Sequence, residues 1–303
     1  MIDNWVRPVP KPDDEFTYQW NADWVNDPEQ PILKITKSSM NCYEWCKKQY
    51  EFQYIDRRPT DMSDALLKGS AVHDGYEKFY DIIKVDHAEN MSESELVDYF
   101  TTLFPIDDYF QVYDSIISFE TQRFIDDRNK GTLDKFVPAG NEIKLDAEII
   151  IPAAANPKFP LRANYKVHLQ GIIDRIFLED GGYVLMELKT GLWKERKVSG
   201  MRKEMAYYKL LYEACEPEVI REVGLDPDIP ITHWGWFYPE SNYTYVEQCK
   251  RASQSTLPKK FAQMINSYEE TLFPADYYYR KCVWCSFMGI CDAAINFQLQ
   301  EDW

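Results

Sequence analysis

The sequence predicts an α/β protein in which a largely helical first half is followed by a mixed β-sheet. Three observations support this prediction. Apolar residues recur at helical spacing over residues 92–103 and 106–127. Polar and apolar residues alternate from Asn141 to Ile149, as they do in a half-buried strand. Two short apolar segments then flank a turn over residues 179–182, which predicts an antiparallel hairpin. Helices, strands and a further helix in this order fit a sheet with helical additions.

The predicted domain organisation is an N-terminal arm followed by one domain. Residues 1–33 are rich in Pro, Asp, Asn and Trp without periodicity, and we expect them to form an extended arm. Residues 34–303 are expected to form a single domain, with a helical part at about 61–130 and a sheet core at about 140–250. There are no internal repeats.

Capping residues indicate where the first helices begin. One helix is expected to start with Ser38 or Ser39 as its cap and to continue through Trp45, Cys46, Tyr50 and Phe52. The next is expected to have Asp61 or Ser63 as its cap. The remaining predicted elements are a helix over about 199–215, strands over about 231–238 and 243–248, and a helix over about 253–268.

Composition narrows the class of protein. With 45% hydrophobic residues the 303-residue chain is expected to be globular, although its net charge is −16. No apolar run reaches the ~20 residues of a membrane span, and the first residues lack a signal peptide's basic start and apolar centre. The expected location is therefore the cytoplasm (host cytosol or nucleoid), with no membrane partner.

The cysteines predict a metal site near the C-terminus. An odd number of cysteines, seven, in a cytosolic protein is poor material for disulfides, whereas the clustered Cys282, Cys285 and Cys291 are typical of metal ligands. A fourth thiolate could come from Cys42 or Cys46, which lie four residues apart on the predicted helix. Four thiolates can hold either a 4Fe–4S cluster or a structural Zn²⁺, and the spacing does not decide between them.

The predicted hairpin carries a candidate catalytic group. Asp174 lies on its first strand, and Glu187 and Lys189 lie on its second, where the period-two alternation places both on the same face. The two carboxylates are hard oxygen ligands suited to Mg²⁺ or Mn²⁺. Lys189 could orient an attacking water or stabilise developing charge. A surface ion pair is the alternative, but the segment around Glu187 is otherwise apolar.

A local basic segment follows the hairpin in a chain that is acidic as a whole. Between residues 189 and 209 there are seven basic and two acidic residues. A phosphate backbone could lie along such a segment, although a solvated basic helix face is the alternative. The candidate DNA-binding residues are Lys194, Arg196, Lys197, Arg202 and Lys203.

In their order along the chain, these motifs resemble those of the PD-(D/E)XK nuclease superfamily, and within it the RecB-like branch. The resemblance runs from about Lys34 to Cys291. It consists of Gly69-x-x-x-His73, Asp174, Glu187-x-Lys189, Glu204-x-x-x-Tyr208 and the C-terminal cysteines paired with Cys46. The last feature resembles the iron–sulfur clasp of the subgroup containing the AddB nuclease domain and the CRISPR-adaptation exonucleases. Glu204 stands where the family has Gln.

The resemblance implies roles for these residues. His73 and the backbone carbonyl of Leu188 would join Asp174 and Glu187 as metal ligands, and an imidazole ligand favours Mn²⁺. Glu204 and Tyr208 would contact DNA and orient the catalytic lysine, or Glu204 would form a helix ion pair with a neighbouring lysine. For the cysteines the resemblance favours iron over zinc.

The implied function is that of a metal-dependent DNA exonuclease preferring single-stranded ends, in recombination, repair or replication. The alternatives are a flap or junction endonuclease, a non-catalytic DNA-binding assembly subunit, and a zinc-stabilised RNA-processing protein. No Gly-x-x-x-x-Gly-Lys-Ser/Thr occurs in the sequence, so a helicase or other recombination or replication partner would be another chain.

Overall fold

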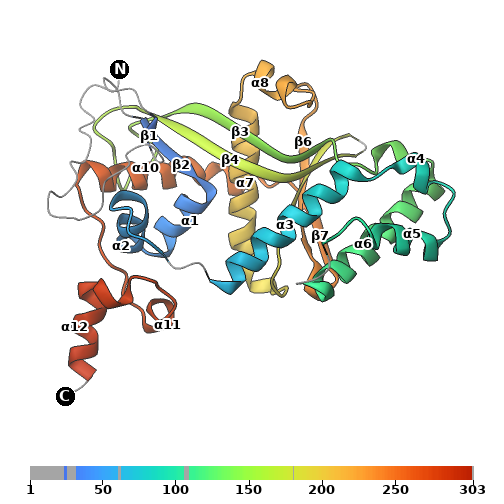
Figure 1. Cartoon of the computed structure of the whole chain (residues 1–303). Helices are drawn as coiled ribbons and strands as arrows, with labels where there is room; N and C mark the ends of the chain where they lie inside the picture. Colours follow the sequence, from blue (N-terminus) through green and yellow to red (C-terminus); the bar gives the residue numbers. More distant parts are fainter. Residues whose placement is uncertain (1–23, 26–31, 61–62, 106–108, 180, 302–303) are drawn as a thin grey trace. The chain divides into compact units, whose positions relative to one another are not determined.

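The computed structural model describes residues 24–25, 32–60, 63–105, 109–179 and 181–301. These residues form two compact units (Figure 1). The first unit comprises the described residues within 1–61, 146–171 and 252–303, and the second comprises those within 62–145 and 172–251. The two long strands β3 (Gly140–Ile151) and β4 (Tyr165–Glu179) each contribute residues to both units. The mixed strands and helices confirm the predicted α/β class.

The first unit combines strands with short helices. Strand β2 (Ile32–Thr36) pairs with β1 (Trp24–Val25) in antiparallel fashion and with β4 in parallel. The helical elements are α1 (Lys37–Trp45), α2 (Lys47–Tyr50), the π-helical turn Glu51–Ile55, α9 (Arg251–Ser255), α10 (Leu257–Glu269), α11 (Tyr279–Cys282), the 3₁₀ turn Met288–Ile290 and α12 (Asp292–Glu301). Of the predicted N-terminal arm, residues 1–23 and 26–31 lie outside the described residues.

Two predictions about the first helix are wrong. The cap is Thr36, whose side chain accepts from the Ser39 backbone N–H while the Ser39 hydroxyl accepts from the Thr36 N–H. This reciprocal pair satisfies two donors at the helix start. The helix also ends at Trp45, because Cys46 is extended, with φ −162° and ψ 119°. Cys42 and Cys46 therefore do not share a continuous helix.

The second unit contains most of the sheet and the longest helices. Its strands are ordered β4-β5-β6-β7, where β5 is Gly182–Leu188, β6 is Ile231–Tyr238 and β7 is Tyr243–Gln248. Strands β5 and β6 are parallel, and the other two pairings are antiparallel. The helical elements are α3 (Asp64–Ile82), α4 (Val85–Ala88), α5 (Glu93–Thr101), α6 (Phe110–Lys130), α7 (Val198–Ala214), α8 (Pro217–Glu222) and the 3₁₀ turns Leu133–Lys135, Glu195–Lys197 and Pro239–Ser241.

The predicted hairpin is confirmed. Strands β4 and β5 pair in antiparallel register, with Glu179 opposite Gly182 and Arg175 opposite Met186. Gly181 has φ +95°, a conformation that glycine adopts without steric cost. A tight turn of this kind fixes the register of both strands, and therefore the face on which each side chain lies.

Helix α3 is held in place by close packing against α6. A Cβ added to Gly75 would lie 2.5 Å from the Tyr113 hydroxyl, so only glycine permits this approach. The Tyr113 hydroxyl in turn donates to the Ala71 carbonyl of α3 at 2.9 Å. Ser63 caps α3, as predicted, by accepting from the Leu66 N–H. These contacts fix the side chains that α3 presents to the strands.

The other predicted helices of this unit are present. The segment 92–103 contains α5, which Ser92 caps. The segment 106–127 overlaps α6, which begins at Phe110 and ends three residues later than predicted, at Lys130; residues 106–108 lie outside the described residues. Among the helices that the structure describes, none is long and apolar enough to cross a bilayer.

Candidate metal and catalytic site

Three side chains from separate elements of the second unit converge on one point. They are His73 of α3, Glu142 of β3 and Asp174 of β4, and one ligand atom from each lies within 4.8 Å of the others. The His73 Nδ1 is 3.5 Å from the Glu142 Oε1 and 3.7 Å from the Asp174 Oδ2. An imidazole and two carboxylates at this spacing are a donor set that suits a divalent cation such as Mn²⁺ or Mg²⁺.

Glu142 was not predicted as a ligand, and its backbone explains why. Its φ of +49° lies in the left-handed region, which a non-glycine residue occupies at a cost of about 1–3 kcal/mol. The preceding Asn141 side chain donates to the Glu77 carbonyl of α3 at 3.0 Å and ties this part of β3 to that helix. In the sequence, the turn-forming pair Gly140-Asn141 indicates that the regular alternation of side chains between the two faces of the strand is interrupted just before Glu142.

The surroundings of His73 favour its positive charge. Burial alone would lower the pKa of His73, but the hydrogen bond to Glu142 and the negative charges of Asp174 and Glu142 outweigh it, so that the pKa is raised. The two acids therefore attract a cation to this point, whether it is a proton on the imidazole or a metal ion.

Asp174 is held rigidly at the end of the hairpin. It is only 6% exposed, and its Oδ2 accepts a hydrogen bond of 2.8 Å from the Leu188 backbone N–H of β5. A buried carboxylate needs such a donor, because burial without one is costly. The same bond places Leu188 directly beside Asp174, while its predicted role as a carbonyl ligand stays a prediction.

Glu187 of β5 and Lys189, which directly follows this strand, contact each other. The Lys189 Nζ is 2.9 Å from the Glu187 Oε1 and 2.9 Å from the Glu204 Oε2 of α7. Contact with Lys189 is one of the alternatives expected for Glu204. Lys209, which could have paired with Glu204, instead bonds to Glu213. The ammonium group is thus held between two carboxylates.

Tyr208 lies on the same helix face as Glu204 and close to the whole acidic group. Burial raises its pKa well above the usual value near 10, and the charges of Glu187 and Asp174 raise it further. The Tyr208 hydroxyl therefore keeps its proton and can serve as a hydrogen-bond donor.

The predicted site residues thus fall into two neighbouring sets on the hairpin. One set contains His73 and Asp174 together with Glu142, and the other contains Lys189 with its two carboxylate partners, Glu187 and Glu204. Glu187 is not a member of the three-residue ligand group. The charges of Asp174 and Glu187 both act on Tyr208, which links the two sets.

The basic segment after β5 is only partly available to a ligand. Lys194, Arg196 and Lys197 are exposed. Arg202 pairs with Glu247 of β7 through two contacts of 2.5 and 2.6 Å, so its charge is already matched. Lys203 is half-buried on α7.

The cysteines gather in the first unit. Cys46, Cys282, Cys285 and Cys291 all line one small cavity of about 30 Å³, together with Phe52. Cys42 is not among the residues that line it, and its thiol donates to the Gln53 side chain at 3.6 Å. Burial, followed by the proximity of Cys46 and Cys285, raises the pKa of Cys42 to about 12. The four thiols share this cavity, but in the described part of the chain no three of them lie within 4.8 Å of one another.

The tyrosines that follow Cys46 in the sequence do not line this cavity. Tyr50 stacks on Tyr54 at 5.2 Å, and its hydroxyl bonds to that of Tyr268, but neither Tyr50 nor Tyr54 lines the cysteine cavity. Phe52 packs against Phe287 there instead. The short π-helical turn after α2 rotates these side chains away from the simple four-residue pattern.

Comparison with known proteins gives a family match. A family model described as the PD-(D/E)XK nuclease superfamily matches residues 34–292. A search of curated proteins finds no match. Among solved structures, one described as "Crystal structure of SSO0001" is 13% identical, covers 86% of this chain and 87% of that one, and has a TM-score of 0.37.

Proposed function

The chain belongs to the PD-(D/E)XK nuclease superfamily, and from this premise we propose that it is a metal-dependent deoxyribonuclease acting on single-stranded ends. The superfamily comprises nucleases, which hydrolyse phosphodiester bonds in nucleic acids. Membership of the RecB-like branch, the preference for DNA ends, and a role in recombination, repair or replication belong to the proposal.

One observation carries this proposal. Ligand atoms of His73, Glu142 and Asp174 lie within 4.8 Å of one another, next to a lysine held between two carboxylates. A divalent cation bound there would neutralise charge on the phosphate and make a water more acidic. The imidazole among the ligands favours Mn²⁺. The backbone carbonyl of Leu188 and the carboxylate of Glu187 would complete the ligand set.

The remaining residues would position the reactants. Lys189 is held between Glu187 and Glu204, and it would orient the attacking water or stabilise the leaving oxygen. Tyr208, protonated and buried beside these groups, would donate a hydrogen bond to a phosphate oxygen. Glu204 would act through Lys189, because it accepts from that ammonium group.

Glu142→Gln tests the ligand that the sequence did not predict. The substitution keeps the size of the side chain and removes its charge, so we expect the Mn²⁺ concentration for half-maximal cleavage to rise about tenfold or more. Glu148→Gln is the matched control on the same strand, since Glu148 is more exposed and pairs with Lys166. Equal metal requirements in the two variants would remove Glu142 from the site.

The exposed part of the basic segment would bind the phosphate backbone. Changing Lys194, Arg196 and Lys197 together to Gln should weaken DNA binding and reduce the slope of log affinity against log salt by about two to three. The same change at Arg202 should have less effect, because Glu247 already matches its charge. A salt slope identical to that of the wild type would show that DNA enters elsewhere.

We further propose a 4Fe–4S cluster at Cys46, Cys282, Cys285 and Cys291, with Zn²⁺ as the alternative. The four thiols border one cavity, which supports a common ligand. Such a group would join distant parts of the chain and stabilise the first unit. An unwinding partner such as a helicase would be a separate chain.

Digestion of end-labelled linear and of circular single-stranded DNA in the presence of Mn²⁺ tests the proposed activity. An exonuclease releases mononucleotides or short fragments from the linear strand and leaves the circle intact. Cutting of the circle would favour a flap or junction endonuclease of the same fold. No cleavage of either substrate, by protein that binds DNA, would indicate a non-catalytic subunit.

A further inference from the structure

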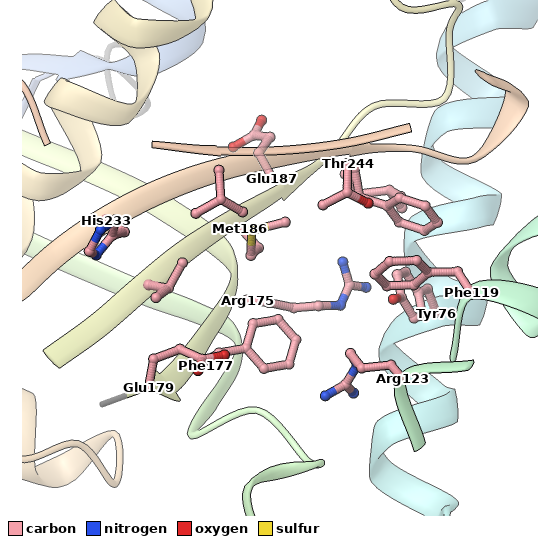
Figure 2. A pocket seen from close by; sticks show the side chains of 14 residues that line it. Tyr76, Phe119, Arg123, Arg175, Phe177, Glu179, Met186, Glu187, His233 and Thr244 are labelled. Atoms are coloured by element: carbon pink, nitrogen blue, oxygen red, sulfur yellow. The ribbon is translucent and has the colours of Figure 1, made fainter. Parts of the chain in front are cut away.

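A second feature of the second unit lies beside the proposed catalytic group. It is a cavity of about 410 Å³, lined among others by Tyr76, Phe119, Arg175, Phe177, Met186 and Phe237 (Figure 2). Its volume is within the range of small-molecule sites, and its walls are mostly aromatic and aliphatic. Arg175 follows Asp174 on β4, so the two side chains point to opposite faces of this strand, and Tyr76 lies one helical turn from His73 on α3.

Arg175 gives this cavity one strongly polar point. The residue is 2% exposed, and its Nε and Nη2 atoms have no hydrogen-bond partner within the described part of the chain. Its guanidinium lies 3.6 Å from the centroid of the Tyr76 ring, which offers a cation–π contact but no acceptor. Figure 2 shows the side chain extending from β4 toward Phe119 and Tyr76. An arginine is always charged, so unfilled donors in such a place are costly.

Three carboxylates in or near the cavity do not meet this requirement. Glu120 is fully buried, but it is taken up by Arg123 at 2.9 Å and by the Tyr80 hydroxyl at 2.8 Å. Glu187 lines the cavity and pairs with Lys189. Glu179 also lines it but is exposed to solvent at the strand end. The cavity therefore keeps a buried cation that an anionic ligand could match.

The walls of the cavity suit a flat apolar group. Phe119 stacks on Phe237 with ring centroids 4.2 Å apart and an interplanar angle of 25°. Phe177 and Met186 supply further apolar surface from neighbouring strands. Aromatic side chains of this kind bind nucleobases by stacking, with little dependence on which base is present.

We infer that this cavity binds one nucleotide, with the base among the aromatic side chains and the phosphate at Arg175. The inference rests on the proposed function, since a nuclease acting beside the cavity both holds and releases nucleotides. The nucleotide could be the terminal unit of a bound strand or a released monophosphate. Both present the same chemistry, a flat base joined through a sugar to an anionic phosphate.

Binding of thymidine 5′-monophosphate to the metal-free full-length protein, measured by calorimetry in EDTA, tests the inference without requiring cleavage. The monophosphate should bind at least about tenfold more tightly than thymidine or inorganic phosphate alone, because only it supplies both the base and the anion. Equal affinities for the monophosphate and for inorganic phosphate would overturn the inference. Decanoate is an apolar anion without a base, and it should bind more weakly than the monophosphate. Equal affinities for these two ligands would overturn the inference as well.

Val246→Trp and Gln248→Trp provide a matched pair of variants. Val246 lines the cavity and is 48% exposed, so a larger side chain can fill the cavity from its edge without disturbing the core. Gln248 is two residues further on the same face of β7 and is not among the lining residues. The first variant should lose at least about tenfold in affinity and the second should stay within about twofold. Equal affinities in the two variants would exclude the cavity as the nucleotide site.

The Arg175→Met variant should also lose affinity for the monophosphate. The Val246→Trp variant remains decisive if Arg175→Met does not fold.

An oligonucleotide carrying 2-aminopurine at either end distinguishes the two sources of the nucleotide, the end of a bound strand and a released monophosphate. Quenching of its fluorescence by wild-type protein, but not by Val246→Trp, would identify the strand end as the ligand. Absence of quenching, with monophosphate binding retained, would identify the released nucleotide. Nucleotide binding in a protein that cleaves no DNA would leave this inference standing and remove the proposed function. Cleavage of DNA by a protein that does not bind the monophosphate would remove this inference and leave the proposed function standing.

Discussion

Asp174→Asn is expected to lower the rate of DNA cleavage by about 10²–10³-fold while leaving the protein folded. Asparagine has the same shape and can still accept the Leu188 N–H, so the hairpin should keep its geometry. It lacks the negative charge that a divalent cation requires at the point shared with His73 and Glu142. The measurement is the rate constant at saturating Mn²⁺, together with the melting temperature.

Asp146→Asn is the control for this prediction. Asp146 lies on the neighbouring strand β3, its side chain is more than half exposed, and it is outside the ligand group. The Asp146→Asn variant should cleave DNA at the wild-type rate. A rate for Asp174→Asn within about tenfold of the wild type would mean that hydrolysis takes place elsewhere.

Cys46→Ser is expected to remove the metal or cluster from the first unit, whereas Cys42→Ser should retain it. Cys46 lines the cavity shared with Cys282, Cys285 and Cys291, and Cys42 does not. Loss of one of four thiolates should also release the C-terminal segment, because binding energy of a structural metal is folding energy. Iron and zinc contents, visible absorbance and the rate of proteolysis after residue 270 are the quantities to measure in protein purified without oxygen.

The two cysteine variants have opposite outcomes, which makes the comparison decisive. Full metal content in Cys46→Ser, with loss in Cys42→Ser, would exchange the two assignments. Zinc without iron in the wild type would keep the four-thiolate site and replace the cluster by Zn²⁺. A wild-type protein with neither metal would remove the site.

The hairpin that carries Asp174, Glu187 and Lys189 could be predicted because its signals are local. Alternation assigns each side chain to a face, and the turn that contains Gly181 fixes the register. Strands β6 and β7 were predictable for the same reason. His73 was assigned to the site only through the resemblance of Gly69-x-x-x-His73 to a family motif, and its helix was predictable from the Ser63 cap.

Features that depend on tertiary contacts could not be predicted. Glu142 reaches His73 through a left-handed backbone conformation that no alternation rule contains. Cys46 leaves the helical conformation between α1 and α2, although its neighbours all favour a helix. Arg202 was grouped with the DNA-binding residues because its partner Glu247 is 45 residues away in sequence.

Cleavage of end-labelled single-stranded DNA by protein first treated with EDTA and then supplied with Mn²⁺ tests whether the group around Asp174 is a metal-dependent nuclease centre. The chelated protein should release no labelled product, and Mn²⁺ should restore cleavage to the wild type but not to Asp174→Asn. Cleavage that persists in EDTA, or that returns equally in both proteins, would contradict a metal site at His73, Glu142 and Asp174.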